Sequence, residues 1–420
     1  MNFRVFAGAA ALPMAIALAQ PALAAPEPQF GEPIAVGDGL VLDPIIEGRL
    51  RYESVDQAAL DADALTLRLR AGVEARTGGL SWLTEIESTL ALAEDYNAFP
   101  FPHTSDQRRP GFAIVADPRS VELNRLQARY KGKAGALTLG RQRINLDDQR
   151  WVGSVGWRQN EQTFDAVRGE ASIGELHFDA SYAISQRTIW GDDAGPRTAF
   201  DGDFLFVGAG YKLGAVQVKG FAYLLDFDTD EQLGPLAVGN ADTQTYGIRA
   251  ATVLPITNNT RLSLTASYAR QSDYQQNPAE YSADYVAAEA GLAIAGLWLG
   301  GGYELLGSDR GRAVQTPMAT LHKFNGWADQ FLTTPAAGLE DIYGGLAHKF
   351  DGIKALPGLN AAVWYHRYRT EGGGDLGEEW NASAGFRLGK VALLAKYAAF
   401  SAGVLGTDTD KLWLQAEFAF

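Results

Sequence analysis

Hydrophobic and polar residues alternate along many stretches of this chain. In residues 175–185 every second side chain is apolar, namely Leu176, Phe178, Ala180, Tyr182 and Ile184. The same period of two recurs in residues 65–74, 261–269, 380–388 and 411–420. This period indicates β-strands with one apolar and one polar face. Runs of roughly 9 to 12 residues are long enough for a tilted strand to cross a bilayer.

The connections between these runs are of two kinds that alternate along the chain. Short links fall at 77–79, 132–135, 172–174, 214–215, 257–259, 295–296 and 389–390, and a middling link at 351–358 takes a short-link position. Longer polar links fall at 54–63, 94–119, 145–160, 186–202, 228–242, 271–282, 307–338, 371–376 and 402–409. The pattern predicts an all-β, transmembrane, antiparallel up-and-down β-barrel of about 18 strands, with both termini periplasmic. A soluble sandwich or propeller does not sort its connections in this way.

The N-terminal residues have the pattern of a secretory signal peptide. Arg4 precedes an apolar run at 5–18, and Ala22-Leu23-Ala24 has the small-x-small form of a cleavage site. We therefore expect a cleaved signal peptide at 1–24, a periplasmic segment at 25–44 and an outer-membrane barrel at 45–420. The expected location is the bacterial outer membrane, where lipids are the first partners.

Composition and spacing exclude several function classes. The chain has 36 Lys and Arg against 50 Asp and Glu, a formal charge of -14, which argues against a nucleic-acid binder. The five histidines lack metal-site spacing, so no metal or cofactor is expected. The acidic group Asp226, Asp228, Asp230 and Glu231 is interpreted as a solvated loop in preference to a calcium site. Only His366 with Ser383 could be paired for hydrolysis, and no enzyme is predicted.

A barrel of about 16 to 18 strands leaves an aqueous channel, so function is expected in the lumen. Residues 140–168 concentrate five arginines, Arg141, Arg143, Arg150, Arg158 and Arg168, among the acids Asp147, Asp148, Glu161 and Asp165. Such a ladder predicts a constriction that attracts carboxylates, while the alternative is a salt-bridged wall that only holds the loop. Further pore-lining candidates are Arg68, Arg70, Arg387 and Lys396.

The strand alternation slips at two places near this cluster. It slips at 123–126 and again near Arg141, which shares the parity of Leu137 and Leu139 and would point toward lipid. We expect a bulge there to return Arg141 to the lumen. Trp151 and Trp157 are candidate stacking surfaces for sugar rings.

At these residues the sequence resembles the alginate-export family of outer-membrane barrels. The matching stretches are GRQRINLDDQRWVGSVGWRQNEQTFDAVR at 140–168 and TPMATLHKFNGWADQFLTTPAAGLEDIYGG at 316–345. The resemblance implies an 18-stranded monomeric barrel whose arginine-lined constriction passes an anionic uronic-acid polymer outward. It marks Arg141, Arg143, Arg150 and Arg158 as candidate carboxylate contacts, with Asp165 and Arg168 beside them. In the second stretch His322, Trp327 and Asp329 are loop candidates, in a lid or in simple packing.

Three functions remain open at this point. The first is export of an anionic polysaccharide, with periplasmic export partners. The second is uptake of small organic acids or oligosaccharides through the same barrel. The third is a structural or adhesive barrel with a closed lumen.

Overall fold

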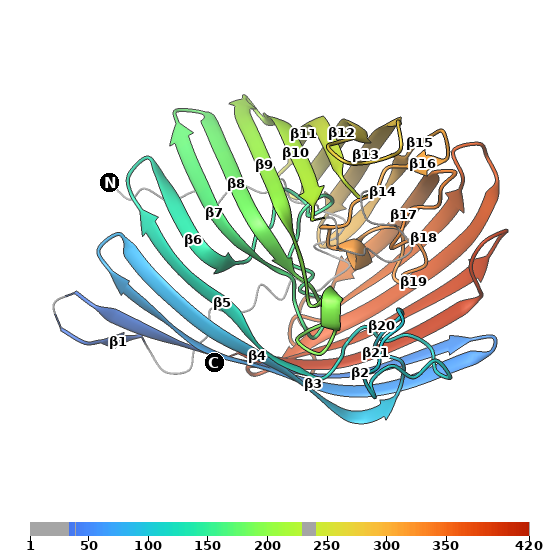
Figure 1. Cartoon of the computed structure of the whole chain (residues 1–420), viewed down its shortest axis with the longest axis horizontal. Coiled ribbons are helices and arrows are strands. Elements are labelled where there is room, and N and C mark those ends of the chain that lie inside the picture. The colour runs from blue at the N-terminus through green and yellow to red at the C-terminus, as the bar shows by residue number, and fades with distance from the viewer. Residues whose placement is uncertain (1–32, 38, 229–240, 420) are drawn as a thin grey trace.

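The computed structural model describes residues 33–37, 39–228 and 241–419. Within them, eighteen antiparallel strands form a closed barrel (Figure 1). The barrel strands are β2 (Val41–Gln57), β3 (Leu60–Thr77), β4 (Leu80–Asp95), β5 (Ser120–Lys131), β6 (Gly135–Gln142), β7 (Thr163–Ile173), β8 (Leu176–Arg187), β9 (Ala199–Leu213), β10 (Val216–Phe227), β11 (Thr243–Thr257), β12 (Thr260–Asp273), β13 (Ser282–Ile294), β14 (Leu297–Leu306), β17 (Leu339–Lys349), β18 (Asn360–Arg369), β19 (Asp375–Leu388), β20 (Val391–Ala402) and β21 (Thr409–Ala419). The small elements are β1 (Ile34–Ala35), β15 (Ser308–Asp309), β16 (Arg312–Ala313) and the 3-10 turns η1 (Gly195–Arg197) and η2 (Leu321–Lys323).

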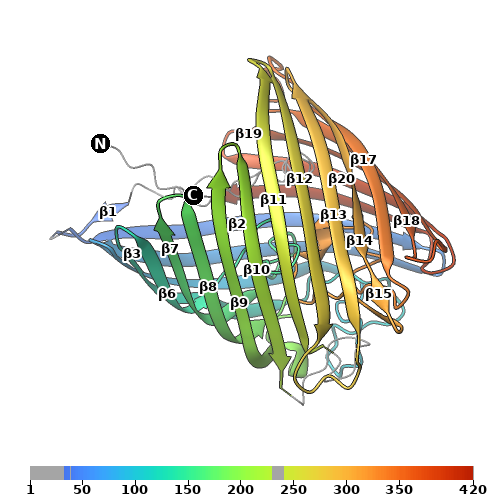
Figure 2. The same ribbon diagram turned by 90° about the horizontal axis from the view of Figure 1, so that it is seen from above.

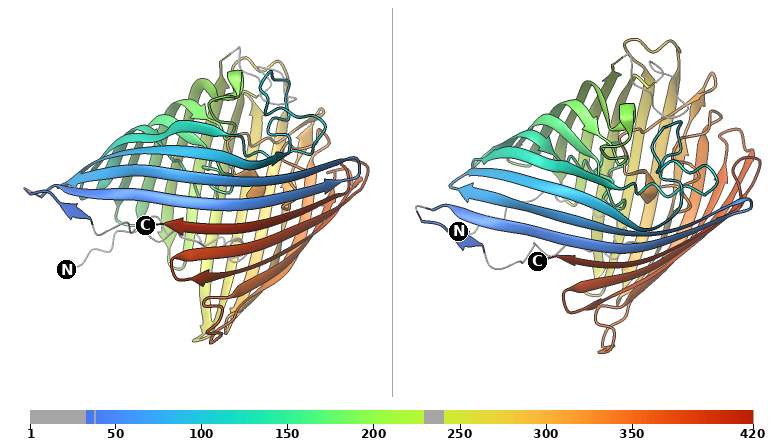
Figure 3. Two further views of the ribbon diagram at one scale, coloured as in Figure 1. Left: turned by 90° about the horizontal axis from the view of Figure 1, so that it is seen from below. Right: turned by 60° about the horizontal axis from the view of Figure 1, so that its bottom comes forward.

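The first and last barrel strands close the sheet. β2 pairs antiparallel with β21, with Glu47 opposite Ala419 and Asp56 opposite Asp410. Figure 3 shows these two strands side by side, and Figure 2 shows the tilt of β11 to β14 in the opposite wall. The predicted fold class and strand number are confirmed. β2 begins and β21 ends at the rim that carries the short turns, which is the periplasmic rim of such barrels.

Two boundaries differ from the sequence prediction. β2 begins at Val41, so the barrel starts before residue 45. The long link predicted at 54–63 is wrong, because β2 and β3 continue to a tight turn in which Gln57 stands opposite Leu60. These strands contain 17 and 18 residues, more than a bilayer crossing needs. The part that projects beyond the membrane has polar residues on both faces, so its sequence resembles a loop.

The outward face of the barrel is apolar and ends in tyrosines near the long-loop rim. Leu69, Leu80 and Trp82 are exposed on this face, as expected for side chains that contact lipid. Several tyrosine hydroxyl groups donate to a carboxylate on the neighbouring strand, among them Tyr52 to Asp63, Tyr182 to Asp203, Tyr268 to Asp284, Tyr365 to Glu378 and Tyr397 to Asp410. Such amphipathic rings belong at a membrane interface.

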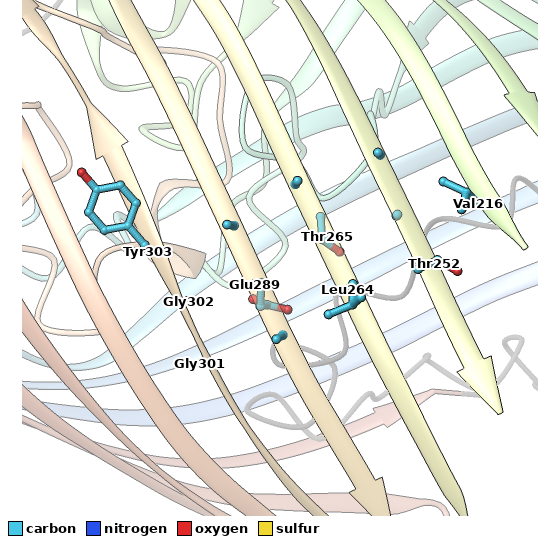
Figure 4. Close-up of a pocket in the computed structure, with 13 residues that line it drawn as sticks. Val216, Thr252, Leu264, Thr265, Glu289, Gly301, Gly302 and Tyr303 are labelled. Atoms are coloured by element: carbon cyan, nitrogen blue, oxygen red, sulfur yellow. The ribbon is translucent and has the colours of Figure 1, made fainter. Parts of the chain in front are cut away.

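A shallow groove between β10 and β14 lies on this outward face. The register places Leu264 opposite Ala290 and Thr252, and Ala290 opposite Gly301, so these residues share one face of the wall. Leu264 is exposed, and Figure 4 shows it with Gly301 and Tyr303 along the groove. The groove therefore faces lipid and is not a solute site. In the described part of the chain, no helix has the length and apolarity needed to span a membrane.

The predicted signal peptide at 1–24 lies outside the described residues, as do Asp230 and Glu231 of the acidic group. Of the segment expected at 25–44, residues 33–37 and 39–44 are described, and they include β1 and the start of β2.

Candidate functional site

Two loops fold into the lumen and meet at its centre. The β6–β7 loop (143–162) carries most of the predicted arginines, and the β16–β17 loop (314–338) carries the second matching stretch. Both lie inside the ring of strands in Figure 1. The backbone N–H of Gly153 donates to the carbonyl of Met318, and that of Thr320 to the carbonyl of Gln149. The two loops therefore form one packed unit across the channel.

Wall cations on β10 and β11 hold the tip of the β6–β7 loop. Lys219 and Arg249 stand opposite each other in the register. The Lys219 Nζ lies 2.8 Å from Asp147 Oδ2, and the Arg249 Nη1 lies 2.7 Å from Asp148 Oδ2. The Nζ of Lys323, from the other loop, donates to the Asp148 carbonyl at 2.6 Å. The acids predicted to tune a pore thus anchor the loop to the wall.

Arg150 joins both loops to β14. Its Nε donates to Glu304 Oε1 at 2.7 Å, and its other nitrogen atoms donate to Thr316 and Asn325. Only 4% of the Arg150 side chain is exposed, so the guanidinium is a buried crosslink. Asn325 in turn donates to Glu304 Oε2 at 2.7 Å.

Arg158 makes the matching crosslink at the opposite wall. Its Nη1 lies 3.2 Å from Glu53 Oε2 on β2, and its Nη2 lies 2.7 Å from Asp329 Oδ2 on the β16–β17 loop. Asp117, which precedes β5, lies 3.9 Å away. The guanidinium is buried, so its three acids balance its charge in a medium that screens poorly. The β6–β7 loop therefore spans the lumen between two charged anchors.

Four arginines line the lumen face of β2 and β3 beside this anchor. Alternation turns Arg49 and Arg51 inward on β2, and Arg68 and Arg70 inward on β3. Arg49 stands opposite Arg68 in the register and opposite Glu417 on the other side. We call Arg49, Arg51, Arg68 and Arg70 the arginine wall.

The β6–β7 loop docks on the arginine wall through its backbone. Arg49 Nη1 donates to the carbonyl oxygens of Gly156, Trp157 and Arg158 at 3.0, 3.1 and 3.2 Å. Arg51 Nη2 donates to the Trp157 carbonyl at 2.5 Å. Carbonyl groups carry no net charge, so these contacts add no negative charge to that of the acids on the wall, such as Asp117 at 3.4 Å from Arg51 Nη1.

Arg68 is the least satisfied member of the wall. Its side chain is fully buried, and among the described residues it forms ion pairs with Glu417 at 3.0 Å and Glu47 at 3.7 Å. Arg49 shares Glu417 and Arg70 shares Glu47. Among the described residues, the Nε and Nη1 of Arg68 and the Nε of Arg49 have no hydrogen-bond partner. Buried donors without acceptors are costly, so this wall is a place where an anion would be stabilised.

A second network holds the loop where it returns to β7. Glu161 contacts Arg70 at 3.0 Å and also pairs with Arg143, while its backbone N–H donates to Glu87 Oε1 at 2.9 Å. Burial alone would raise the pKa of Glu161, but the charges of Arg143, Arg70 and Arg125 outweigh it and lower the pKa from 4.5 to about 2. The carboxylate stays ionised in mild acid.

This network predicts that the β6–β7 loop stays bound to the wall in mild acid. A carboxyl group whose folded pKa is lowered contributes stability above its unfolded pKa, and the contribution is lost as pH falls through the folded value. We expect the backbone amides of residues 159–162 to stay protected from hydrogen exchange down to pH ~4.5 and to lose protection between pH ~4.5 and ~2. In Glu161→Gln, protection should be weaker at neutral pH and should no longer change in that window. Loss of protection in the native chain above pH ~5 would contradict this.

An aromatic cluster surrounds Lys396 where the loops meet β20 and β21. The Lys396 Nζ lies 4.0 Å from the centre of the Trp157 ring and 3.9 Å from that of Trp327. His322 stacks on Trp157 with ring centres 4.7 Å apart and an angle of 3°. Trp413 meets both rings edge-on. Arg51 covers Trp157 at 4.1 Å.

The structure therefore brings together most, but not all, of the predicted site residues. Those in or beside the loop unit are Arg143, Arg150, Arg158, Arg68, Arg70, Lys396, Trp157, His322, Trp327 and Asp329. Arg168 faces the lumen beside Asp179, outside the unit. Arg387 lies near the periplasmic end of β19. Strand alternation places it on the lumen face, because its neighbour Leu388 is exposed on the outward face. His366 contacts Asp341 at 3.0 Å, within a structural pair.

The predictions for Arg141 and Asp165 are corrected by the register. The two residues stand opposite each other and form an ion pair at 2.8 Å. Arg141 also stands opposite Leu126, which is 54% exposed on the outward face. The β5–β6 and β6–β7 pairings pass through this position without a shift, so the expected bulge is not there. The slip predicted at 123–126 is confirmed, as a bulge between β4 and β5.

The tryptophans also differ from expectation. Trp151 packs against the wall residues Tyr285 and Phe221, with ring centres 5.1 and 6.1 Å away. Both faces of Trp157 are covered, by Arg51 and by His322. Trp157, which is 7% exposed, therefore offers no free face to a sugar.

Sequence reasoning missed several partners that complete the unit. They are Arg49, Arg51, Glu53, Asp117, Lys219, Arg249, Asn325 and Glu379. Period-two alternation could have found Arg49 and Arg51, which share the inward parity of β2. Glu379 has the inward parity of β19 as well, and its carboxylate accepts the backbone N–H groups of Trp327 and Ala328.

Comparison with known proteins identifies the family. The model described as alginate export matches residues 50–298. This chain belongs to the alginate export family. It is an outer-membrane channel of that family, which confirms the expectation of a channel and not an enzyme. A search of curated proteins finds no match.

Solved structures share the fold of this alginate export family member at low sequence identity. OccK9 (OpdG) of Pseudomonas aeruginosa is 16% identical with a TM-score of 0.69, over 90% of this chain and 97% of that chain. OccAB4 of Acinetobacter baumannii is 11% identical with a TM-score of 0.68, over 89% and 97%. OpdK of Pseudomonas aeruginosa, solved with vanillate, is 14% identical with a TM-score of 0.66, over 90% and 98%.

Proposed function

We propose that this channel passes small organic acids, with the arginine wall as the site that selects for a carboxylate. The observation that carries the proposal is Arg68, whose buried guanidinium has two nitrogen atoms without an acceptor among the described residues. Carboxylates are the natural partners of a guanidinium, because two parallel N–H donors match two oxygen atoms.

The size of the solute follows from the loop unit. Arg150, Arg158 and Asn160 are each at most 5% exposed, so the loops pack tightly across the lumen. A small solute needs only a transient displacement of part of this unit. A polymer would have to keep the loop unit displaced until its whole length had passed. Weak binding at several sites then allows passage without stalling.

The fold also supports a small organic acid as the solute. OpdK, whose barrel is similar, has been solved with vanillate, which is a small organic acid. A second candidate is a uronic-acid polymer, and the match to the alginate export family favours it. Both solutes carry carboxylates, and they differ in length. The predicted signal peptide, the monomeric state and any periplasmic partner remain predictions.

Permeation into liposomes separates these candidates. Glucuronate and glucose are nearly equal in size and differ by the carboxylate. We expect glucuronate to enter liposomes that contain the barrel about tenfold faster than glucose, the ratio given by about 1.4 kcal/mol of differential stabilisation. An oligouronate of six units should enter far more slowly. Equal rates for glucuronate and glucose would contradict selection by a carboxylate, and rapid oligouronate entry would favour the polymer.

A further inference from the structure

A chain of hydrogen bonds links the β16–β17 loop to the barrel wall at His322. The Nε2 of His322 lies 2.7 Å from the Nζ of Lys396 on β20. Its Nδ1 lies 2.7 Å from Oδ1 of Asp329. The other Asp329 oxygen accepts from Arg158 at 2.7 Å and from Lys411 at 3.3 Å. This chain connects both loops with β20 and β21.

The contact between His322 and Lys396 has room for one N–H hydrogen between the two nitrogen atoms. An ammonium group donates, and the imidazole Nε2 accepts only when it carries no proton. The Nδ1 proton then donates to Asp329. No carboxylate of the described residues forms an ion pair with Lys396. A second proton on the pair would place two positive charges 2.7 Å apart with no acceptor between them.

The imidazole cannot turn away from this contact while the loop is docked. It is 3% exposed and stacks on Trp157, with Trp413 at its edge. The two positive charges on His322 and Lys396 can therefore separate only if the loop itself moves.

The charges around His322 come from every element packed on it. The β16–β17 loop supplies Asp329, and the β6–β7 loop supplies Arg158. β2 supplies Arg51 and Glu53, β19 supplies Glu379, β20 supplies Lys396 and β21 supplies Lys411. The cations Lys396, Arg158, Arg51 and Lys411 face the acids Asp329, Glu53 and Glu379. Among the described residues, the carboxylate that forms an ion pair with His322 is that of Asp329, which Arg158 and Lys411 already share.

We propose that protonation of His322 releases the β16–β17 loop from Lys396, so that the channel opens in mild acid. This inference extends the proposed function to its regulation, and it rests on that function only in so far as the lumen conducts. In this loop His322 and Trp327 contact Lys396, and Asp329 contacts Arg158 and Lys411, so a charge on His322 acts on the contacts with all three cations.

The sign of the pH dependence follows from the two states. Burial lowers the pKa of His322 well below 6.5 in the docked state, against the opposite effect of Asp329. In the released state the imidazole is in water, with a pKa near 6.5. The released state therefore binds the extra proton more tightly and gains on the docked state as pH falls below about 6.5. The ratio of released to docked state should rise by up to tenfold for each pH unit in that range.

Conductance of the refolded chain in planar bilayers measures this ratio. Between pH 7 and pH 5 we expect the open fraction to rise by at least tenfold. His322→Gln keeps a polar side chain of similar reach that cannot titrate, and its open fraction should not change over this range. The matched control is His177→Gln on β8, whose exposed imidazole contacts Ser172, and its response should equal that of the native chain.

A second readout does not depend on conduction. Backbone amides of residues 321–329 should exchange at least tenfold faster at pH 5 than at pH 7 after correction for the intrinsic rate, and His322→Gln should abolish the change. A pH-independent native chain, or a response that survives in His322→Gln, would overturn the proposal. Failure of the proposed function would appear instead as equal permeation of glucuronate and glucose, with the pH response intact.

Discussion

Replacing Arg158 with methionine should open the channel at neutral pH. The guanidinium holds Glu53, Asp117 and Asp329 in a buried site. Methionine keeps much of the length of the side chain but leaves three carboxylates without their shared cation. Breaking a buried ion pair from one side costs about 3–5 kcal/mol. Here that cost falls on the docked state, because the acids regain water when the loops separate.

Single-channel recording is the direct measurement for Arg158→Met. The open fraction at pH 7 should rise at least a hundredfold over the native chain, which corresponds to about 2.7 kcal/mol. Arg310→Met is the matched control, because the Arg310 side chain is 67% exposed in a long-loop position and should have no effect. Adding Glu53→Gln to Arg158→Met should restore part of the closed state. An unchanged open fraction in Arg158→Met would show that this crosslink does not hold the loops.

Replacing Arg49 and Arg68 together with glutamine should invert the ion preference of the lumen. The two residues stand opposite each other and share Glu417. Their loss leaves Glu417 and Glu47 on the wall with fewer cations, so the local potential becomes negative. We expect the anion-to-cation permeability ratio to fall at least tenfold, which corresponds to about 1.4 kcal/mol.

The control for this pair is Arg141→Gln. Arg141 is paired with Asp165 on the outward face, so its replacement should leave ion preference unchanged. The same glutamine pair should also bring glucuronate and glucose entry close to each other. A double variant that keeps the native preference would show that selection lies elsewhere in the lumen.

Alternation was enough to predict the barrel and many inward side chains. Arg68 and Arg70 were assigned to the lumen because strand parity is a local property of the sequence. Parity alone placed Arg141 toward lipid, where the register has it, and the assumption of an added bulge misplaced it. The projecting ends of β2 and β3 were interpreted as a loop, because polar residues occupy both faces once a strand leaves the membrane.

The partners within the lumen depend on contacts that no local pattern contains. Arg158 reaches Glu53, 105 residues away in the chain, and Arg150 reaches Glu304, 154 residues away. The clustered arginines were correctly expected to pair with acids. The acids nearby in the sequence, however, are not the ones that pair with Arg150 and Arg158. Barrel closure and the inward fold of two loops decide which charges meet.

The reversal potential of the refolded barrel in a planar bilayer under a salt gradient tests the central claim most directly. A lumen that selects through the arginine wall should prefer anions, although the whole chain has a formal charge of -14. Added glucuronate should reduce the chloride current by competing for the same guanidinium groups. A preference for cations, or a chloride current that glucuronate leaves unchanged, would contradict the assignment of the arginine wall as the selective site.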